Sequence, residues 1–386
     1  MTQVILDHAI IQALQTHGES VDSALLNGVR RLSELFTVGR GAIGFDYLSE
    51  PALRRAYLTY FAPVNIAKTY SVLREIPVLS PRPLRVLDIG CGPGVGGFAL
   101  LQYLSGDERK AYAGSEVVCV DRNPETLRDA ESMWRNLAES GLSSILPTLH
   151  MQRLDLERRG SNATWKHERF DVILLVNSLN EIFLSTADPV DARTRLLTHL
   201  LECLAADGSL IVIEPALRAT SRALHEVRDR LVTQGTANVY SPCLHDQGCP
   251  ALLRRGDWCH EERPWRAPAI IEDIDRAVGF IKDALKFSYM VLRKDSRTIV
   301  HRDLNDYRVV SERMIMKGEQ RVWLCNEMGR QVVGRLDKER SENNASFDRW
   351  ERGAIVRVTE IDRRGCVGRI RKTAMADVIR PVTGKS

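Results

Sequence analysis

A glycine-rich loop is the clearest chemical feature of the sequence. The segment VLDIGCGPG at 86–94 has the pattern of a buried strand that contains Asp88 and runs into three alternating glycines. Glycine lets the backbone turn sharply and approach a ligand closely. In α/β sheets such a loop lies at the carboxyl ends of the strands, where ligands bind. Asp121 ends the next expected strand, and its carboxylate can accept both hydroxyls of a ribose. The sequence therefore predicts a nucleoside-containing cofactor.

Two cofactors fit this loop, and the residue ahead of the glycines separates them. Gly92, Gly94 and Gly97 match the G-x-G-x-x-G spacing of dinucleotide-binding proteins. An acid before alternating glycines, as at Asp88, is instead typical of the first motif of class I methyltransferases and favours S-adenosylmethionine. A NAD-dependent enzyme is the weaker alternative. A further alternative is a degenerate domain that has this fold but no longer binds a ligand. The predicted S-adenosylmethionine contacts are Asp88, Gly90, Gly92, Gly94 and Asp121, with Asp155, after an expected strand at 151–154, near the adenine.

Candidate catalytic residues follow the expected strand at 172–176, in the segment NSLNE at 177–181. Amino-directed methyltransferases usually carry Asn or Asp, two prolines and an aromatic residue here, which hold the target nitrogen and stack on its base. That motif is absent from this sequence. Between Cys119 and Cys203 there is also no cysteine to act as the nucleophile of RNA carbon-5 methylation. Asn177, Asn180 and Glu181 are the candidates for orienting a substrate, and helix capping and packing is the alternative interpretation.

Three of the eight cysteines lie close together in the sequence. Cys243, Cys249 and Cys259 follow C-x5-C-x9-C spacing in a segment with little periodicity, and Cys325 in the later segment WLCNEMG is a fourth candidate. Four thiolates hold either tetrahedral zinc or an iron–sulfur cluster. Zinc sites usually begin with a tight C-x2-4-C pair, which is absent, so the wide spacing favours a [4Fe–4S] cluster. Two histidines next to the cysteines are possible zinc ligands, so zinc is the alternative. Unrelated cysteines are the third interpretation, although they would leave reactive thiols exposed.

The elements that must position these residues alternate between strands and helices. This order implies a parallel sheet with helices on both faces. We therefore predict an α/β, Rossmann-like class I S-adenosylmethionine-dependent methyltransferase fold. The expected strands are 84–89, 117–120, 151–154, 172–176 and 209–213, and the expected helices are 124–140, 193–204, stopped by Asp207-Gly208, and 217–232.

The flanking sequence differs from this region. Residues 1–80 have the periodicity of a helical N-terminal region, and three prolines within 77–83 mark a linker. Residues 81–295 form the predicted Rossmann-like S-adenosylmethionine-binding domain, with a Cys-rich metal insert at 240–265 and a further strand at 286–293. Residues 296–386 contain short expected strands, such as 321–324 and 354–358, between polar turns. They predict a small, basic, β-rich C-terminal domain.

Charge is unevenly distributed along the chain. The 386 residues carry a net charge of +4, but 22 Lys and Arg face 14 Asp and Glu from Val291 onward. A basic segment on a mildly acidic body is typical of RNA-binding proteins, and a solvated basic surface is the alternative. No apolar run is long enough to span a bilayer, and residues 1–11 have neither a basic start nor a small-residue cleavage site. We expect a cytoplasmic protein of bacterial type, with no targeting segment, no membrane and no DNA partner.

Four segments together resemble one family, the mitochondrial small-ribosomal-subunit methyltransferase-like proteins and their bacterial counterparts. They are RAYLTYFAPVN at 55–65, the loop at 86–94, SPCLHDQGCP with DWCH at 241–260, and KFSYMVLRK at 286–294. The resemblance covers roughly 45–330, and the basic β-rich tail with Cys325 is similar more loosely. Within the tail, SFDRWER at 346–352 departs from the family's basic and aromatic end.

The resemblance implies a role in maturation of the small ribosomal subunit and in translation. It implies a [4Fe–4S] cluster on Cys243, Cys249, Cys259 and Cys325, and a methyltransferase-like fold without an established methylation target. We therefore expect an S-adenosylmethionine-binding, [4Fe–4S]-containing assembly or translation factor that binds small-subunit rRNA. The alternative is a catalytically active rRNA methyltransferase whose cysteines bind zinc or an iron–sulfur cluster.

Overall fold

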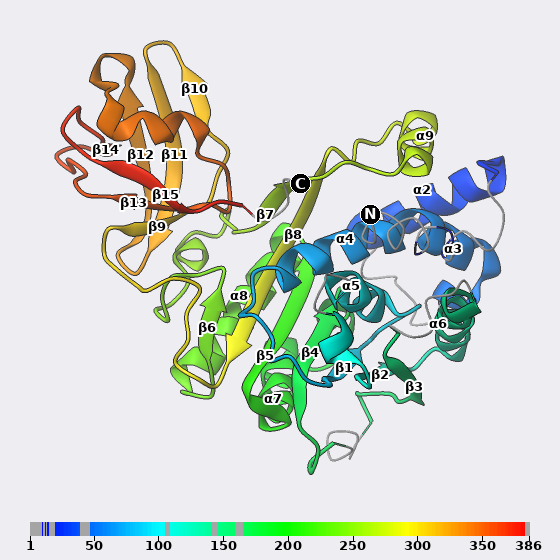
Figure 1. Cartoon of the computed structure of the whole chain (residues 1–386). Coiled ribbons are helices and arrows are strands. Elements are labelled where there is room, and N and C mark those ends of the chain that lie inside the picture. Colours follow the sequence, from blue (N-terminus) through cyan, green and yellow to red (C-terminus); the bar gives the residue numbers. More distant parts are fainter. Residues whose placement is uncertain are drawn as a thin grey trace. The chain divides into compact units, whose positions relative to one another are not determined.

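Figure 1 shows a computed structural model of the chain, which describes residues 20–38, 47–104, 109–139, 146–158 and 165–382, and the single residues Ile10, Gln12 and Leu14. The chain divides into two compact units. Unit 1 comprises Met1–Ile213 and Trp265–Leu285, and unit 2 comprises Glu214–Pro264 and Lys286–Ser386. These units follow spatial contacts, so the domain boundaries that the sequence predicts after residues 80 and 295 stay predictions. Most of residues 1–11, in which the sequence predicts no targeting segment, lie outside the described residues.

Unit 1 opens with helices, as the N-terminal sequence predicts. α2 (Ser23–Thr37) begins where the Asp22 side chain accepts a hydrogen bond from Leu25 N at 2.8 Å, which satisfies a free N–H of the first turn. After η2 (Tyr47–Ser49), α3 (Pro51–Ala56) runs through a π-helical turn, η3 (Tyr57–Phe61), into α4 (Ala62–Leu73). The sequence did not indicate the π turn. A later helix, α9 (Ala269–Val278), also belongs to this unit.

The centre of unit 1 is a parallel sheet, which confirms the predicted Rossmann-like class I fold. Its strands are β1 (Arg85–Ile89), β2 (Glu116–Asp121), β3 (Thr148–Arg153), β4 (Phe170–Val176) and β5 (Leu204–Pro215), in the order β3-β2-β1-β4-β5. All four pairings are parallel. β4, with the sequence FDVILLV, is buried along its whole length, as expected of a central strand covered on both faces.

Three helices connect these strands: α5 (Val95–Leu104), α6 (Pro124–Leu137) and α7 (Pro189–Glu202). α5 follows the glycine loop directly, and eight of its ten residues are buried. α6 and α7 each begin with a proline after a capping side chain, Asn123 and Asp188. In the described parts of the chain, no helix is both long enough and apolar enough to cross a bilayer.

The prediction for the end of α7 is wrong in one respect. Asp207-Gly208 does not stop the helix, because α7 ends at Glu202 and β5 already begins at Leu204. The two residues lie within β5, where the pairing with β4 shifts register between Phe170 and Val172. This irregularity accommodates turn-forming residues inside a strand. Asp-Gly therefore marks an irregularity within β5 and not the end of α7.

Unit 2 contains the Cys-rich insert and the helix before it. α8 (Arg218–Thr233) leads into β6 (Asn238–Ser241), which pairs antiparallel with β8 (Ala284–Arg293). Between them lie η9 (Pro250–Leu253) and β7 (Glu261–Pro264), and β7 also pairs with β8. The insert thus has little regular structure of its own.

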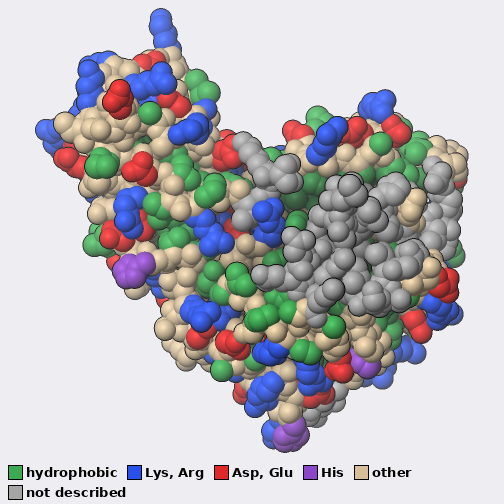
Figure 2. All heavy atoms as spheres, in the orientation of Figure 1, with side chains coloured by type: hydrophobic (Ala, Val, Ile, Leu, Met, Phe, Trp, Pro, Cys, Tyr) green, Lys and Arg blue, Asp and Glu red, His purple; other side chains and the backbone are tan. Residues whose placement is uncertain are grey.

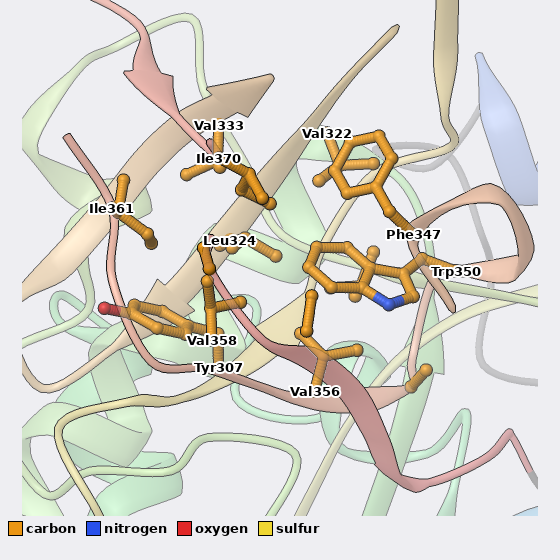
Figure 3. Packing of buried hydrophobic residues seen from close by; sticks show 14 residues of the cluster. Tyr307, Val322, Leu324, Val333, Phe347, Trp350, Val356, Val358, Ile361 and Ile370 are labelled. Carbon is orange, nitrogen blue, oxygen red and sulfur yellow. The ribbon is translucent and has the colours of Figure 1, made fainter. Parts of the chain in front are cut away.

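The rest of unit 2 is β-rich, as the sequence predicts. A second sheet has the order β14-β12-β11-β9-β13-β15, with β10 paired to β11. Apolar side chains from β9, β11, β12 and β13 pack with Phe347 and Trp350 into one core (Figure 3). The two aromatic residues of the segment SFDRWER are therefore core residues, with ring centroids 4.7 Å apart. The strands are β9 (Asp306–Val309), β10 (Met314–Met316), β11 (Glu319–Asn326), β12 (Gly329–Leu336), β13 (Ile355–Val358), β14 (Gly368–Arg369) and β15 (Ala376–Arg380), with η10 (Asp337–Glu339) and η11 (Glu342–Arg349) between β12 and β13.

Candidate functional site

The cofactor loop, Ile89–Gly94 in unit 1, turns on its glycines. Gly90, Gly92 and Gly94 have φ angles of 62°, 51° and 85°, in the left-handed region that favours glycine. A Cβ on Gly90 would lie only 2.4 Å from Ser178 Cβ. Ser178 Oγ donates to Ile89 O at 2.9 Å, which fixes the loop against the end of β4. A Cβ on Gly92 would meet no described atom within 4 Å, so the loop has an open side there.

Asp88 lies fully buried beneath the loop. Its carboxylate accepts a hydrogen bond from Gly97 N, in the first turn of α5, at 3.2 Å. A Cβ on Gly96 would lie 2.6 Å from Asp88 Oδ2, so glycine is required at this close approach. Burial raises the pKa of Asp88 to about 7, against the backbone N–H groups of Gly97 and Gly96, which lower it. Asp88 thus supports the loop and the start of α5 from below.

Asp121 joins the second strand to the loop. Its Oδ2 accepts a hydrogen bond from Gly92 N at 2.9 Å, and its Oδ1 accepts one from Asn123 N at 2.8 Å. Burial raises the pKa of Asp121, and these two hydrogen bonds oppose the rise. A carboxylate has about four lone-pair sites. Acceptor capacity therefore remains for the ribose hydroxyls that the sequence analysis assigns to Asp121.

Asp155 follows β3 at the same edge of the sheet. β3 places Arg153 opposite Asp121, and Leu154 N donates to Asp121 O at 3.0 Å. Asp155 Oδ1 accepts from Glu157 N at 3.0 Å, and Oδ2 lies 3.6 Å from Arg158 Nε. The side chain is engaged in a local turn, and its contact with adenine stays a prediction.

Strained backbone marks the segment after β4. Asn177 and Phe183 have φ angles of 55° and 61°, which cost side-chain-bearing residues about 1–3 kcal/mol each and cluster at functional sites. Asn177 N donates to Ile213 O at 2.7 Å, and Asn180 Nδ2 donates to Asn177 O at 2.9 Å. Asn177 Oδ1 is buried without a hydrogen-bond partner among the described residues. Two of the three candidate catalytic residues are thus joined in one strained turn.

Glu181, the third candidate, contacts a residue that the sequence analysis missed. Tyr47 Oη donates to Glu181 Oε1 at 3.5 Å. Nearby in the sequence, Tyr57 Oη accepts from Asn65 Nδ2 at 3.3 Å, and Asn65 Oδ1 accepts from Lys68 Nζ at 3.3 Å. Tyr47 of η2 thus contacts the segment after β4, and Tyr57, Asn65 and Lys68 are linked to one another within η3 and α4.

The pKa values of both tyrosines are raised, by burial and by the charges of carboxylates. Burial and then the charge of Glu181 raise the pKa of Tyr47. Burial also raises the pKa of Tyr57, the hydrogen bond from Asn65 opposes this, and the charges of Glu181, Asp121 and Asp88 add to it. The π turn that carries Tyr57 is the kind of irregularity often found at functional sites, but helical periodicity gives no signal of it.

In unit 2, the four predicted cysteine ligands line one cavity, which we call the cysteine pocket. It measures about 40 Å³, more than the roughly 10–15 Å³ that one water needs. Cys243, Cys249 and Cys259 come from the insert, and Cys325 comes from β11. The other four cysteines do not line it. The fold thus brings together the four cysteines that the sequence analysis selected.

One face of α8 holds the insert in place. The Arg228 side chain is buried, donates through Nη2 to His245 O at 2.5 Å, and donates through Nη1 to Gln247 O. Its neighbour Asp229 accepts a hydrogen bond from Cys249 N at 2.8 Å. These contacts fix the backbone between the first two cysteines.

The same helix also fixes the backbone around the third cysteine. His225 Nε2 lies 3.0 Å from Cys259 O, and Ser288 Oγ of β8 donates to the same carbonyl at 3.0 Å. Arg222 Nη1 donates to Ala251 O at 3.1 Å and to Asp257 O at 2.8 Å. A segment without regular structure is therefore positioned by side chains of α8, which the sequence analysis did not identify.

The thiols of the cysteine pocket act on one another. Burial and then the neighbouring Cys243 raise the pKa of Cys259 to about 12, and the same two causes, in that order, raise the pKa of Cys325. Ionising several thiols in one pocket is costly without a cation. Among the residues that the structure describes, no three His, Cys, Asp or Glu side chains are placed to share a single metal ion.

The two neighbouring histidines differ in position. His245 lines the cysteine pocket and is buried, and burial lowers its pKa to about 4. His260 does not line the pocket, and its Nε2 lies 3.0 Å from Glu262 Oε1. Of these two histidines, His245 is therefore the one that lines the pocket, together with His225 of α8.

A family model described as "Mitochondrial small ribosomal subunit Rsm22" matches residues 52–347. The matched range includes the cofactor loop, the segment 177–181 and all four cysteines of the cysteine pocket. No curated protein matches the sequence.

Several solved structures are similar at low identity. A TehB-like SAM-dependent methyltransferase from Corynebacterium glutamicum is 14% identical over 70% of this chain and 97% of that one, with a TM-score of 0.31. An arsenic (III) S-adenosylmethionine methyltransferase from Chlamydomonas reinhardtii is 15% identical over 69% and 85%, with a TM-score of 0.33. The CurJ carbon methyltransferase is 20% identical over 74% and 70%, with a TM-score of 0.35. These similarities are weak, so the fold assignment rests on the strand order.

Proposed function

The chain belongs to the Rsm22 family, whose model is that of a mitochondrial small-ribosomal-subunit protein, and from this premise we propose that it is a factor of small-subunit assembly or translation. In this proposal it binds small-subunit rRNA, S-adenosylmethionine and a [4Fe–4S] cluster. The observation that carries the proposal is the family match, which spans both the cofactor loop and the cysteine pocket.

The cofactor loop supports S-adenosylmethionine binding. Gly92 is open on one side, and Asp121 is held at the neighbouring strand end by two backbone N–H groups. This arrangement suits a nucleoside whose ribose lies against Asp121 and whose remaining part passes over the loop. Asp88 takes a supporting role in this proposal, because it is buried and bonded to the start of α5. Gly90, Gly92 and Gly94 supply the close backbone approach.

The cysteine pocket is the site proposed for the cluster. All four cysteines line this one cavity. Four cysteine thiolates hold a [4Fe–4S] cluster, and four also hold a zinc ion, which is the alternative. When bound, the cluster would supply a one-electron redox centre and link the insert to β11.

Sedimentation of cell extracts through sucrose gradients tests the ribosomal part of the proposal. The chain should co-sediment with small-subunit particles, and its depletion should reduce mature small subunits while large subunits persist. The proposal would be contradicted if the chain sedimented apart from ribosomal particles at every stage of growth and the ratio of the subunits stayed normal after its depletion.

An active rRNA methyltransferase is the second candidate, and the strained turn at 177–183 favours it. Asn177 Oδ1 is a buried acceptor that a donor group of a substrate would satisfy. Methyl transfer from labelled S-adenosylmethionine to rRNA, lost in Asn177→Ala with cofactor affinity unchanged, would support this function. Equal transfer by both proteins would argue against a role for Asn177.

The cytoplasmic location is proposed from the sequence alone. The description of the family model names the mitochondrion. Fractionation of the source cells distinguishes the two locations.

A further inference from the structure

A surface cavity in the β-rich part of unit 2 combines several arginines with one acid. It measures about 350 Å³ and is lined by Asp362, Arg364, Arg369, Arg371 and the turn 365–367. We call it the arginine pocket. Two further basic residues, Arg363 and Lys372, lie in the same stretch of sequence. The residues that line the cavity thus include three arginines and one acid, and two further acids, Glu319 and Glu339, pair with Arg369 and Arg371.

Asp362 organises the arginines. Its Oδ2 accepts from Arg364 Nη2 at 2.6 Å and from Arg371 Nη2 at 2.9 Å, and its Oδ1 accepts from Arg364 Nε at 2.9 Å. These side-chain hydrogen bonds, with that of Arg364 the largest cause, lower the pKa of Asp362 well below its ordinary value. Arg369 joins the site through its backbone, since Arg369 N donates to Asp362 O at 2.8 Å. One carboxylate thus holds two guanidinium groups in fixed positions.

The arginines keep donors for an anion. A guanidinium has five N–H donors, and Arg364 gives only its Nε and Nη2 to Asp362. Arg364 is 84% exposed and Arg371 is 41% exposed. Arg371 also lies 3.6 Å from Glu339, and Arg369 pairs with Glu319. The acids orient the guanidinium planes without enclosing them, and fixed planes bind the oxygens of a phosphate in pairs.

Some arginines of the β-rich part are buried and paired with acids. Arg335 is buried against Asp348, and Arg308 is buried beside Glu261. On the face drawn in Figure 2, Lys and Arg side chains of this part are interspersed with Asp and Glu. The net basic charge of the tail therefore does not make its whole surface a binding face, and a cavity with three arginines stands out.

We propose that the arginine pocket binds phosphate groups of the RNA backbone and is a point at which the chain contacts small-subunit rRNA. This inference rests on the proposed function and names the contact site. Neighbouring phosphates of one strand would occupy the cavity, with Arg364 and Arg371 as the donors. No base is read, so the pocket contributes affinity and orientation and not sequence specificity.

The test measures binding of an in vitro transcript of small-subunit rRNA by the cluster-loaded chain over about 50–300 mM salt. The variant is R364Q/R371Q. The control is R195Q/R276Q, which removes two exposed arginines of unit 1 that also pair with aspartates. Each lost phosphate contact should reduce the slope of log affinity against log salt by about 1 and weaken binding on the order of 8-fold near 0.1 M salt. The control should match the wild type.

A second readout uses the exposed Cys366 in the arginine pocket. Its alkylation, followed by mass spectrometry, should slow when the transcript is bound to the wild type. Alkylation at the same rate in the bound complex, or an unchanged slope for R364Q/R371Q, would overturn the inference while rRNA binding itself stands. Absence of rRNA binding by the wild type would overturn the proposed function instead.

Discussion

Cys325 Sγ lies 3.9 Å from His245 Nε2, although the two residues are 80 positions apart in the sequence. Cys325 belongs to β11, and His245 lies between the first two cysteines of the insert. The β-rich sheet and the insert therefore meet at the cysteine pocket. A group bound there would join two parts of unit 2 that lie far apart in the sequence.

Replacing Cys325 should remove the cluster from the insert. We expect Cys325→Ser to lower iron and sulfide content severalfold, because three ligands hold a cluster less firmly than four. Cys366→Ser is the matched control, since Cys366 is exposed and does not line the cysteine pocket. Iron and sulfide analysis after anaerobic purification gives the result. Equal loss in both variants, or loss in neither, would contradict the assignment of Cys325.

Arg228 should act on the cluster through the backbone of the insert. Arg228→Gln leaves the carbonyl groups of His245 and Gln247 without their buried donor, and breaking a buried charged contact costs about 3–5 kcal/mol. We expect faster loss of iron to a chelator as well as a lower melting temperature. Arg255→Gln, at an exposed position of the same insert, is the control. A lower melting temperature with unchanged iron release would mean that Arg228 is only a stability residue.

Gly90 should be required for S-adenosylmethionine binding. An alanine there adopts an unfavourable φ and places its Cβ 2.4 Å from Ser178 Cβ, so the loop must move. We expect Gly90→Ala to weaken binding at least about tenfold by calorimetry. Gly235→Ala has a similar φ, 66°, but no close atom, and lies in unit 2. It should lose stability and keep cofactor affinity, and a loss of affinity there too would argue against a specific effect at the loop.

Asp88 should make the cofactor-free protein less stable as the pH rises. Its pKa is about 7 in the folded chain against an ordinary value of 3.8, because it is buried. The folded state therefore holds a proton that the unfolded state has released, and stability is lost as pH rises from about 4 to about 7. The loss is roughly 4 kcal/mol.

Asp88→Asn isolates this effect, because the amide mimics the protonated acid. We expect the variant and the wild type to have similar free energies of unfolding near pH 4 and the variant to be more stable near pH 7. Burial lowers the pKa of His225 to about 4, which acts in the opposite direction over this range, but it cancels in the difference between the two proteins. A difference that stays constant with pH would contradict a protonated Asp88.

The sequence indicates these sites where the signal is local. Alternating glycines after Asp88 permit a left-handed backbone, and the structure has it at Gly90, Gly92 and Gly94. Three of the four cysteines, Cys243, Cys249 and Cys259, lie close together in a segment with little periodicity, and the fold places them with Cys325 of β11 around one cavity. Strand and helix order follow from apolar periodicity, which is why the sheet is predicted correctly.

Residues that act through tertiary contacts left no such signal. Tyr47, Tyr57 and Lys68 look like ordinary members of helices until the sheet edge is in place. Arg228 looks like a surface residue of an amphipathic helix, yet it is buried against the insert. Asp207-Gly208 has turn-forming composition, but it lies inside β5, where the register with β4 shifts between Leu204 and Ser209. In each case packing overrides the local preference.

Metal and sulfide analysis of the anaerobically purified wild-type chain, together with its absorption spectrum, tests the central claim most directly. We expect a brown protein with broad absorbance near about 400 nm and about four irons and four sulfides per chain. One zinc per chain without iron would contradict the cluster. It would leave the Rossmann-like fold standing and favour a zinc-containing RNA methyltransferase.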